Sequence, residues 1–481
     1  MKRELLRMNH VSLLQNGESL LDNLNFQMFA GEIMGLVAGR NRGYDQLIQL
    51  ICQNLPISFG TVWYDGQIVN TYSHSSGTFN RVYVIEQMSH LVEGLSVVDN
   101  LFVLRKGFKK YFINERVLRE QANKFFGENG LKVNVNKRVS ALTPLERCLI
   151  ELGKALLMGC KLIIIDNPGN FLSQYELMQF QDMLRLVQKN GVSILYIGNH
   201  HQEVFLIADR TSLFFDGRII KVFERNEMTD EGISPYITDW YLPGSQTNPE
   251  QEDGVLHFHS VHGKNLHGLR FVLHRAECLT ILDMDNRIAE DILSLMTGTG
   301  ICFQGRITLD HEPYTPERAA DYLKAGIAVI PKDCSKSLLF HERSYMENLT
   351  FLLDRKLQQS FIPEKIYRSI KNEFGPLVGD FIEESIVTHL PLEEQIALVY
   401  YRILLFHPRV LICIQPLANG DMIVRLRILA LLQEILKTGT AILIITTNVS
   451  DTLMISDRLL IVENGTCVAS YNKNEFDQVD W

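Results

Sequence analysis

The chain has 481 residues, of which 46% are hydrophobic and 21% charged, and its formal net charge at pH 7 is -9. This length exceeds what one hydrophobic core normally serves, so two or more domains are expected. The negative balance argues against nucleic acid or anionic lipid as a partner, and the longest apolar runs are strand-sized, too short to cross a bilayer.

The N-terminal stretch MKRELLRMNHVSLL has neither the apolar region nor the cleavage site of a signal peptide. The eight cysteines are scattered without a C-x-x-C pair, which is typical of buried thiols in a reducing compartment and not of disulfides or zinc ligands. We therefore expect a cytoplasmic protein that is not inserted in a membrane.

Residues 31–51, GEIMGLVAGRNRGYDQLIQLI, predict a strand, a short loop with glycine and a helix. This is the context of a phosphate-binding loop, where backbone N–H groups and a helix N-terminus surround the phosphates. The position of the phosphate-binding lysine is held by Tyr44, and the next residue is Asp45. Tyr44 is bulky and uncharged, and a carboxylate at a helix start can cap the helix N–H groups, so we expect Tyr44 and Asp45 to fill the cradle of this loop.

Further along the first half, strands and helices alternate. The apolar runs KLIIID (161–166) and SILYIG (193–198) are predicted strands of the buried parallel type, and a helical pattern over 174–190 separates them. Strand–helix–strand alternation implies right-handed crossovers. The sequence therefore predicts an α/β fold with a parallel sheet.

Four landmarks of the first half recur in the same order and at a nearly constant separation in the second half. The pairs are GEIMGLV (31–37) with AECLTIL (276–282), VVDNLFVL (97–104) with YMENLTFL (345–352), IIIDNPGN (163–170) with ICIQPLAN (412–419), and IADRTSLFFDGRI (207–219) with ISDRLLIVENGTC (455–467). Repetition of this kind indicates two copies of one domain. The polar stretch 228–254, which contains Gly and Pro, is the predicted linker between domains 1–227 and 255–481.

The order of these landmarks resembles the tandem ATP-binding subunit of sugar-type (ribose/galactose-class) ABC importers over nearly the whole chain. The first half adds LTPLERCLIELGKALL and ILYIGNHHQEVFLIADR to the match, and the second adds AGIAVIPKDCSKSLLFHERSYMENLTF and LPLEEQIALVYYRILLFHPRVLICIQP. The resemblance implies two RecA-like P-loop NTPase cassettes, each with a helical subdomain, that pair as an internal pseudo-dimer. It also implies a membrane permease as partner, a position at the inner face of the cell membrane, and ATP held between the Walker motifs of one cassette and the signature loop of the other.

The nucleotide-binding positions implied by the resemblance are largely lost in the first cassette. The Walker A consensus G-x-x-G-x-G-K-[ST] maps onto 38–45, where only Gly43 remains. Gln87 matches the Q-loop glutamine and Asp166 the Walker B aspartate. Asn167 replaces the catalytic glutamate, and a neutral amide cannot act as a general base. Asn199 replaces the switch histidine.

Two features of the first cassette leave weak nucleotide binding or hydrolysis possible at this site. Arg40 and Arg42 could supply positive charge in place of the lysine, although exposed loop arginines are more often solvated. His200 and His201 could replace the switch histidine only through a shift in register. Weak binding of ATP and Mg²⁺ is therefore open here, and no other cofactor is predicted.

The two signature loops and the second Walker A loop depart further from the family. The L-S-G-G-Q-type run reads LTPLERC, where Thr143 alone keeps a hydroxyl, and LPLEEQI, and each contains proline, which has no N–H to donate. In the second Walker A loop Ala289 stands at the lysine position, and Gln415 follows Ile414 at Walker B. Four carboxylates surround the expected phosphate pocket: Asp283, Asp285, Glu290 and Asp291. Each would oppose a phosphate about 4 Å away by roughly 1–4 kcal/mol if left unpaired.

Two other segments have ordinary explanations beside functional ones. The stretch 257–274 holds five histidines, with His257 and His259 on one strand face. Zinc or nickel binding would need further ligands at suitable spacing, so a surface strand and hairpin is the favoured interpretation. The basic stretch 105–126 is either a solvated helix face or, by the resemblance, a contact for the permease.

The leading hypothesis is a pseudo-ATPase of the sugar-importer type that docks a membrane permease with little or no ATP hydrolysis. One alternative is a soluble regulatory or scaffold protein on the same fold. The other is a weak ATPase that uses the first site only, through Asp166 with His200 or His201.

Overall fold

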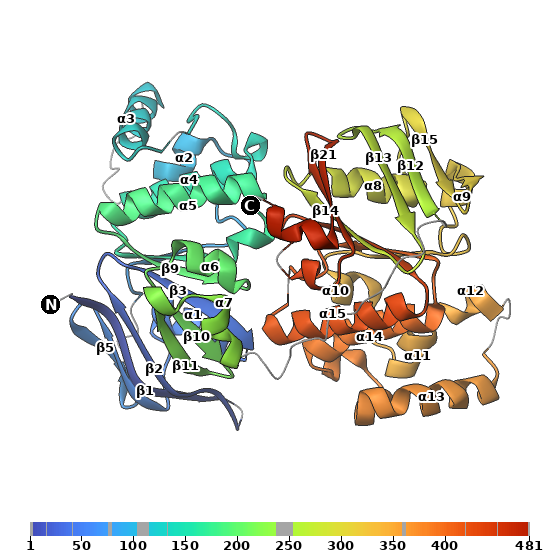
Figure 1. Ribbon diagram of the computed structural model, residues 1–481. Helices are drawn as coiled ribbons and strands as arrows, with labels where there is room; N and C mark the ends of the chain where they lie inside the picture. The colour runs from blue at the N-terminus through green and yellow to red at the C-terminus, as the bar shows by residue number, and fades with distance from the viewer. Residues whose placement is uncertain are drawn as a thin grey trace. The chain divides into compact units, whose positions relative to one another are not determined.

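The computed structural model describes residues 3–15, 17–40, 42–75, 79–102, 115–131, 133–236, 254–357, 362–418, 420–449 and 451–479. It divides into two compact units, Met1–Asp239 and Trp240–Trp481. Each unit combines sheets with helices, so the predicted α/β class is confirmed (Figure 1).

The first unit has a larger, mostly parallel sheet and a smaller antiparallel one. The larger sheet has the order β11-β10-β3-β9-β8-β7 and the smaller β2-β1-β4-β5-β6. The strands are β1 (Glu4–Gln15), β2 (Glu18–Phe29), β3 (Ile33–Arg40), β4 (Phe59–Tyr64), β5 (Gln67–Thr71), β6 (His74–Ser75), β7 (Val82–Ile85), β8 (Leu162–Asp166), β9 (Ser193–Gly198), β10 (Arg210–Phe215) and β11 (Arg218–Glu224). The helices are α1 (Tyr44–Gln53), α2 (Val97–Phe102), α3 (Glu115–Glu128), α4 (Pro144–Leu157), α5 (Gln174–Lys189), α6 (His201–Ile207) and α7 (Asp230–Ile233).

The second unit repeats this arrangement. Its larger sheet has the order β21-β20-β14-β19-β18-β17 and its smaller sheet β13-β12-β15-β16. The strands are β12 (Gly254–His262), β13 (His267–His274), β14 (Cys278–Asp283), β15 (Gln304–Leu309), β16 (Glu312–Pro313), β17 (Ile327–Ile330), β18 (Val410–Ile414), β19 (Ala441–Thr446), β20 (Arg458–Glu463) and β21 (Thr466–Asn472). The helices are α8 (Ile288–Met296), α9 (Pro316–Ala319), α10 (Cys334–Leu338), α11 (Tyr345–Thr350), α12 (Leu353–Leu357), α13 (Glu364–Val378), α14 (Leu392–Phe406) and α15 (Met422–Lys437).

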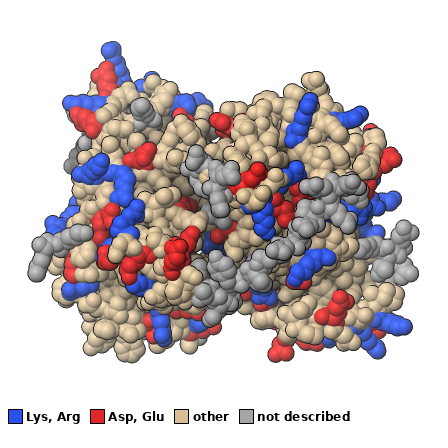
Figure 2. Space-filling view, in the orientation of Figure 1, with Lys and Arg blue, Asp and Glu red and all other residues tan. Residues whose placement is uncertain are grey.

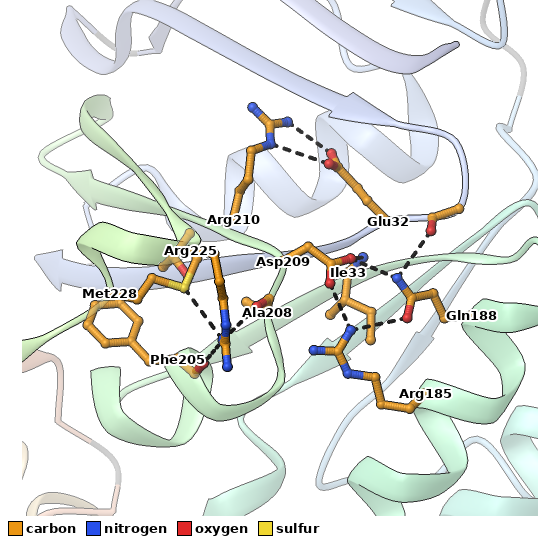
Figure 3. A network of polar contacts seen from close by, with 12 residues as sticks. Glu32, Ile33, Arg185, Gln188, Phe205, Ala208, Asp209, Arg210, Arg225 and Met228 are labelled. Carbon is orange, nitrogen blue, oxygen red and sulfur yellow. Dashed lines mark hydrogen bonds and ion pairs between the residues drawn. The ribbon is translucent and has the colours of Figure 1, made fainter. Parts of the chain in front are cut away.

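The central strand of each larger sheet is fixed at its start by the same polar contacts. In the first unit, Glu32 pairs with Arg210 at 3.0 Å, and the Ile33 N–H donates to Asp209 at 2.9 Å (Figure 3). In the second, Glu277 pairs with Arg458 at 2.8 Å, and the Cys278 N–H donates to Asp457 at 2.9 Å. These contacts hold the strands that lead into the two loops of interest.

Helix α5 joins this network in the first unit. Arg185 and Gln188, in the last turns of α5, reach the Asp209 carboxylate at 2.8 and 2.7 Å, as Figure 3 shows. Gln188 also donates to the Gly31 carbonyl at 3.2 Å. One carboxylate therefore ties the start of β3 to the helix that follows β8.

Several helices begin at a Ser/Thr-x-x-Glu capping box. Thr143 caps α4 with Glu146, Ser173 caps α5 with Glu176, and Ser344 caps α11 with Glu347. Each box satisfies N–H groups that a helix start would leave open. None of the described helices is long and apolar enough to cross a membrane. Acidic and basic side chains are interspersed on the face drawn in Figure 2.

The beginning of the predicted linker belongs to the first unit. Residues 230–236 form α7 and a 3-10 turn (Ser234–Tyr236), in which Ile233 is buried. Asp230 lies 2.6 Å from the His201 ring, and Tyr236 packs edge-on against Phe223. Residues 237–253 lie outside the described part of the chain, and β12 begins at Gly254, the last residue of the predicted linker.

A buried carboxylate supports the loop that follows β7. Glu151 on α4 is only 1% exposed, and it accepts hydrogen bonds from the His90 N–H at 2.7 Å and the Ser89 hydroxyl at 3.2 Å. Burial raises the pKa of Glu151 to about 7, although these bonds and nearby Lys154 favour the charged form. The nearby Glu86 carboxylate raises the pKa further.

We predict that Glu151→Gln stabilises the protein at pH 8. A carboxyl whose pKa is raised on folding binds its proton more tightly in the folded state, so wild-type stability falls as pH rises from about 4.5 to 7. The neutral amide removes this loss while its oxygen still accepts from the His90 N–H. Denaturant unfolding at pH 8 should give a gain of about 1–3 kcal/mol.

The matched control is Glu128→Gln at an exposed position of α3, which should leave stability unchanged at every pH. Equal unfolding free energies for wild type and Glu151→Gln at pH 8, with the same pH dependence, would show that the charged Glu151 carboxylate does not destabilise the fold.

Candidate functional site

Tyr44, which the sequence matches to the phosphate-binding lysine, is buried in the first unit. It is the first residue of α1, it is 9% exposed, and its ring belongs to the core cluster that includes Leu47 and Leu50. Its hydroxyl donates a hydrogen bond to Asp166 Oδ1 at 2.6 Å. Burial and then the Asp166 carboxylate raise the pKa of Tyr44 well above its ordinary value, so the phenol stays a neutral donor.

Asp166 and Asn167 form the other side of this contact, at the end of β8. The Asn167 amide donates to the same Asp166 Oδ1 at 2.7 Å, while Asn167 adopts a left-handed backbone conformation with φ 48°. The Asn167 Oδ1 atom is buried without a hydrogen-bond partner among the described residues. Burial raises the pKa of Asp166 despite the two bonds that it accepts. The amide thus holds the carboxylate and has no basic atom to activate water.

The loop before Tyr44 keeps its glycine for a steric reason. Gly43 has φ 81°, and a Cβ atom there would lie 1.9 Å from the Leu20 carbonyl oxygen. Asp45 is exposed, and within the described part of the chain no hydrogen bond joins its carboxylate to a helix N–H group. The expectation that the Asp45 carboxylate caps the helix start was therefore wrong. Tyr44, the other residue predicted to fill the cradle, is buried.

The remaining residues predicted for the first site are spread over three elements. Gln87 is exposed in the loop after β7, and Thr143 is occupied as the N-cap of α4, accepting from the Glu146 N–H at 3.2 Å. Asn199 is buried after β9, and His201 hydrogen-bonds to Asp230. The structure thus brings Tyr44, Asp166 and Asn167 into direct contact. No hydrogen bond links this trio to Gln87 or Thr143 among the residues that the structure describes.

The second unit fills its corresponding loop in another way. Asp283, the last residue of β14, is 1% exposed, and its Oδ2 accepts from the Ile288 N–H at the start of α8 at 2.9 Å. The backbone N–H groups of Arg287 and Asp285 also favour the charged carboxylate, but burial outweighs them and raises the pKa of Asp283. A side chain therefore occupies the amide donors of this loop.

A second bridge spans the same unit between the loop and the end of β18. The Gln415 amide donates to Asn286 Oδ1 at 3.0 Å. Gln415 has φ 44°, close to the value of Asn167 in the first unit, and Asn286 has φ 55°. In both units, then, a residue that follows the central strand (β3 or β14) is hydrogen-bonded to a residue at the end of another strand (β8 or β18). That strand lies two places away in the sheet.

The other acidic residues predicted around the second loop have internal partners, with one exception. Asp285 accepts from the Asn464 N–H at 2.5 Å, and Asp291 accepts from the Asn265 N–H at 2.5 Å and from its amide at 3.0 Å. Glu290 is exposed. Asp285 and Asp291 are therefore structural acceptors, whose carboxylates hold neighbouring turns to the loop and to α8.

The sequence analysis missed the Tyr44–Asp166 bond and the occupation of the second loop by Asp283. The signal for Asp283 was present, because aspartate commonly accepts a hydrogen bond from the N–H two residues on and from helix starts. The Tyr44 contact joins residues 122 positions apart, and no local pattern indicates it.

Two histidines of the histidine-rich stretch are stacked on β12. His257 and His259 lie side by side on β12 with ring centroids 5.5 Å apart, and His311 lies 5.7 Å from His257. No group of three or more His, Cys, Asp or Glu side chains in the described ranges is arranged to hold a metal ion. β12 and β13 pair antiparallel, which confirms the strand and hairpin predicted from the sequence.

Comparisons with known proteins agree with this architecture. The family model described as ABC transporter matches residues 21–170. A ribose import ATP-binding protein of Clostridium perfringens is 24% identical over 98% of this chain and 96% of its own length. A xylose import ATP-binding protein of Photobacterium profundum is 25% identical over 96% of this chain and 94% of its own length.

A solved structure matches both units as well. An archaeal ribosome recycling factor, crystallised with an archaeal ribosomal stalk protein, aligns with a TM-score of 0.61 over 97% of this chain and 90% of its own. Its sequence identity is 15%, so this likeness concerns the fold alone. The two import proteins align over almost the whole chain, and both units have the same strand order, so the chain is similar to ABC transporter ATP-binding proteins over two tandem cassettes.

Proposed function

We propose that this chain is the ATP-binding-type subunit of a sugar importer and that it works as a pseudo-ATPase, docking a membrane permease without ATP hydrolysis. The observation that carries the proposal is the 2.6 Å hydrogen bond between Tyr44 and Asp166. It supports the proposal because Tyr44, which we match to the P-loop lysine, is neutral and buried, and because its hydroxyl engages the carboxylate that we match to the Mg²⁺ ligand.

The residues of the first site do not fit a bound Mg-nucleotide. The family chemistry needs a cation for the outer phosphates, a hydroxyl for Mg²⁺ and a free Walker B carboxylate. Here the three positions carry Tyr44, Asp45 and an Asp166 that accepts two hydrogen bonds. Three nearby carboxylates, Asp45, Glu86 and Asp166, also raise the pKa of Tyr44.

The second site fits a nucleotide no better. Its loop N–H groups face the Asp283 carboxylate, and an anion beside an anion is unfavourable. Gln415 has no charge to offer a divalent cation, and its amide is bound to Asn286. Neither site therefore supports a hydrolytic step, and we assign none.

The assignment to a sugar importer with a permease partner rests on the similar proteins. Proteins named for ribose and xylose import align from end to end with this chain, which favours the same kind of assembly over a separate scaffold role. A place at the inner face of the membrane follows from such a partner. The weak-ATPase alternative loses support, because His201 is engaged by Asp230 and Asn167 by Asp166.

The docking surface that we propose is the exposed loop after β7 in the first cassette. Gln87 is exposed there, and its neighbour Met88 is 81% exposed, followed by exposed Val92 and Leu95. Exposed apolar side chains close together are typical of protein–protein contacts. The buried Glu151 carboxylate holds this loop by accepting hydrogen bonds from the Ser89 hydroxyl and the His90 N–H.

We predict that Tyr44→Phe destabilises the protein without changing turnover. Loss of the hydroxyl removes one hydrogen bond to a carboxylate, so the free energy of unfolding should fall by about 1–2 kcal/mol. Tyr175→Phe, at an exposed position of α5, is the matched control and should have no effect. Neither variant nor wild type should release phosphate from Mg-ATP above buffer. Phosphate release by wild type that disappears in Asp166→Asn would sink the pseudo-ATPase proposal.

We predict that charge in the loop after β7 breaks the association with the permease. The double change Met88→Asp, Val92→Asp should abolish co-purification with a co-expressed permease of the ribose or xylose importer type, since an apolar contact does not tolerate two buried carboxylates. Ile68→Asp, on β5 and also exposed, is the control and should co-purify like wild type. Equal recovery of the permease with all three proteins would place the contact elsewhere.

A further inference from the structure

We propose that the Asp283 carboxylate takes the place of a phosphate group in the second cassette, so that its loop is an anion cradle with a built-in occupant. The inference rests on the proposed function only in treating the second cassette as free of nucleotide. Asp283 would then explain why the loop is ordered without a ligand, and a loop without this side chain would accept a small oxyanion.

The sheet register places Asp283 at the start of the loop. In the first unit Ala38 of β3 pairs with Phe214 of β10, and in the second Asp283 of β14 pairs with Val462 of β20. Phe214 and Val462 stand at matching positions of the repeated landmark. Asp283 therefore corresponds to Ala38, and the second unit has gained a carboxylate where the first has a methyl group.

The carboxylate is directed at the amide donors that a phosphate would use. Asp283 Oδ2 accepts from the first N–H of α8, a helix of nine residues, at 2.9 Å, and the N–H groups of Arg287 and Asp285 act on it as well. Open N–H groups at a helix start favour a negative charge. The second oxygen, Oδ1, is buried and has no hydrogen-bond partner among the described residues.

No basic side chain compensates this buried charge. Within the described ranges, no ion pair joins Asp283 to a lysine, arginine or histidine, and Arg287 in the same loop is exposed. A buried carboxylate without a counter-ion is costly unless donors surround it. The backbone amides of the loop supply part of that compensation, as they would for a phosphate, although burial still raises the pKa of Asp283.

The loop is also held at two points that do not involve Asp283. Asn286 accepts from Gln415, and Asp285 accepts from the Asn464 N–H. Removing the Asp283 side chain should therefore open the cradle and leave the loop backbone in place. The opened site would take a small oxyanion such as phosphate or pyrophosphate.

The test uses the full chain, with inorganic pyrophosphate as the probe and sodium chloride at matched ionic strength as the blank. Asp283→Ala should gain a pyrophosphate-dependent rise in melting temperature and a saturable heat in calorimetry, whereas wild type should show neither. Asp283→Asn is the matched variant: its side chain still fills the cradle, so it should fold and bind no pyrophosphate. A folded Asp283→Ala protein that ignores pyrophosphate, or a wild type that binds it equally, overturns the proposal.

A measurement on wild type keeps the proposal falsifiable if Asp283→Ala does not fold. The Ile288 amide should be protected from hydrogen exchange to the level of the α8 core, and Asp283→Asn should lower that protection while leaving the Ile292 amide unchanged. Fast exchange at Ile288 in wild type overturns the inference. Pyrophosphate binding by Asp283→Ala together with Mg-ATP turnover by wild type would instead refute the pseudo-ATPase proposal and leave this inference standing.

Discussion

The Tyr44 hydroxyl and the Asp166 carboxylate meet across β9, which lies between β3 and β8 in the parallel sheet. Strands two positions apart are separated by about 10 Å, and a tyrosine side chain that starts at the first residue of α1 closes that gap. The second unit closes the equivalent gap across β19 with Gln415 and Asn286. In each cassette, protein side chains thus meet at the carboxyl ends of the parallel strands, where the ligands of open α/β sheets usually bind.

Much of the fold around these bridges does not depend on a nucleotide. Glu32 with Arg210 and Glu277 with Arg458 fix the two central strands at the end away from the loops. Asn100 and Asn348 hold equivalent turns before α2 and α11, each accepting from a backbone N–H and donating to carbonyl groups. These contacts, which recur in both halves, hold strands and turns in place. The two halves differ at the positions that we match to phosphate-binding residues. This division is what we expect if the fold is kept while nucleotide binding is lost, as we propose.

Local patterns predicted the fold well, and long-range contacts escaped them. The alternation of apolar runs and helical patterns indicated the parallel sheets, and the repeated landmarks indicated two cassettes. The polar composition of 228–236 suggested a linker, because nothing in that stretch reveals that Ile233 is buried or that Tyr236 packs on Phe223. At the first site the residue types identified the loss of the lysine and the base. The local pattern did not show that Tyr44 would join the same core cluster as Leu47 while Asp45 stayed exposed.

The central claim is that both cassettes are closed to nucleotide by their own side chains. Calorimetric titration of the full-length protein with Mg-ATP tests it most directly, because binding precedes any turnover and reports on both sites at once. The account predicts no saturable heat up to millimolar Mg-ATP. A saturable isotherm with a micromolar dissociation constant would contradict it.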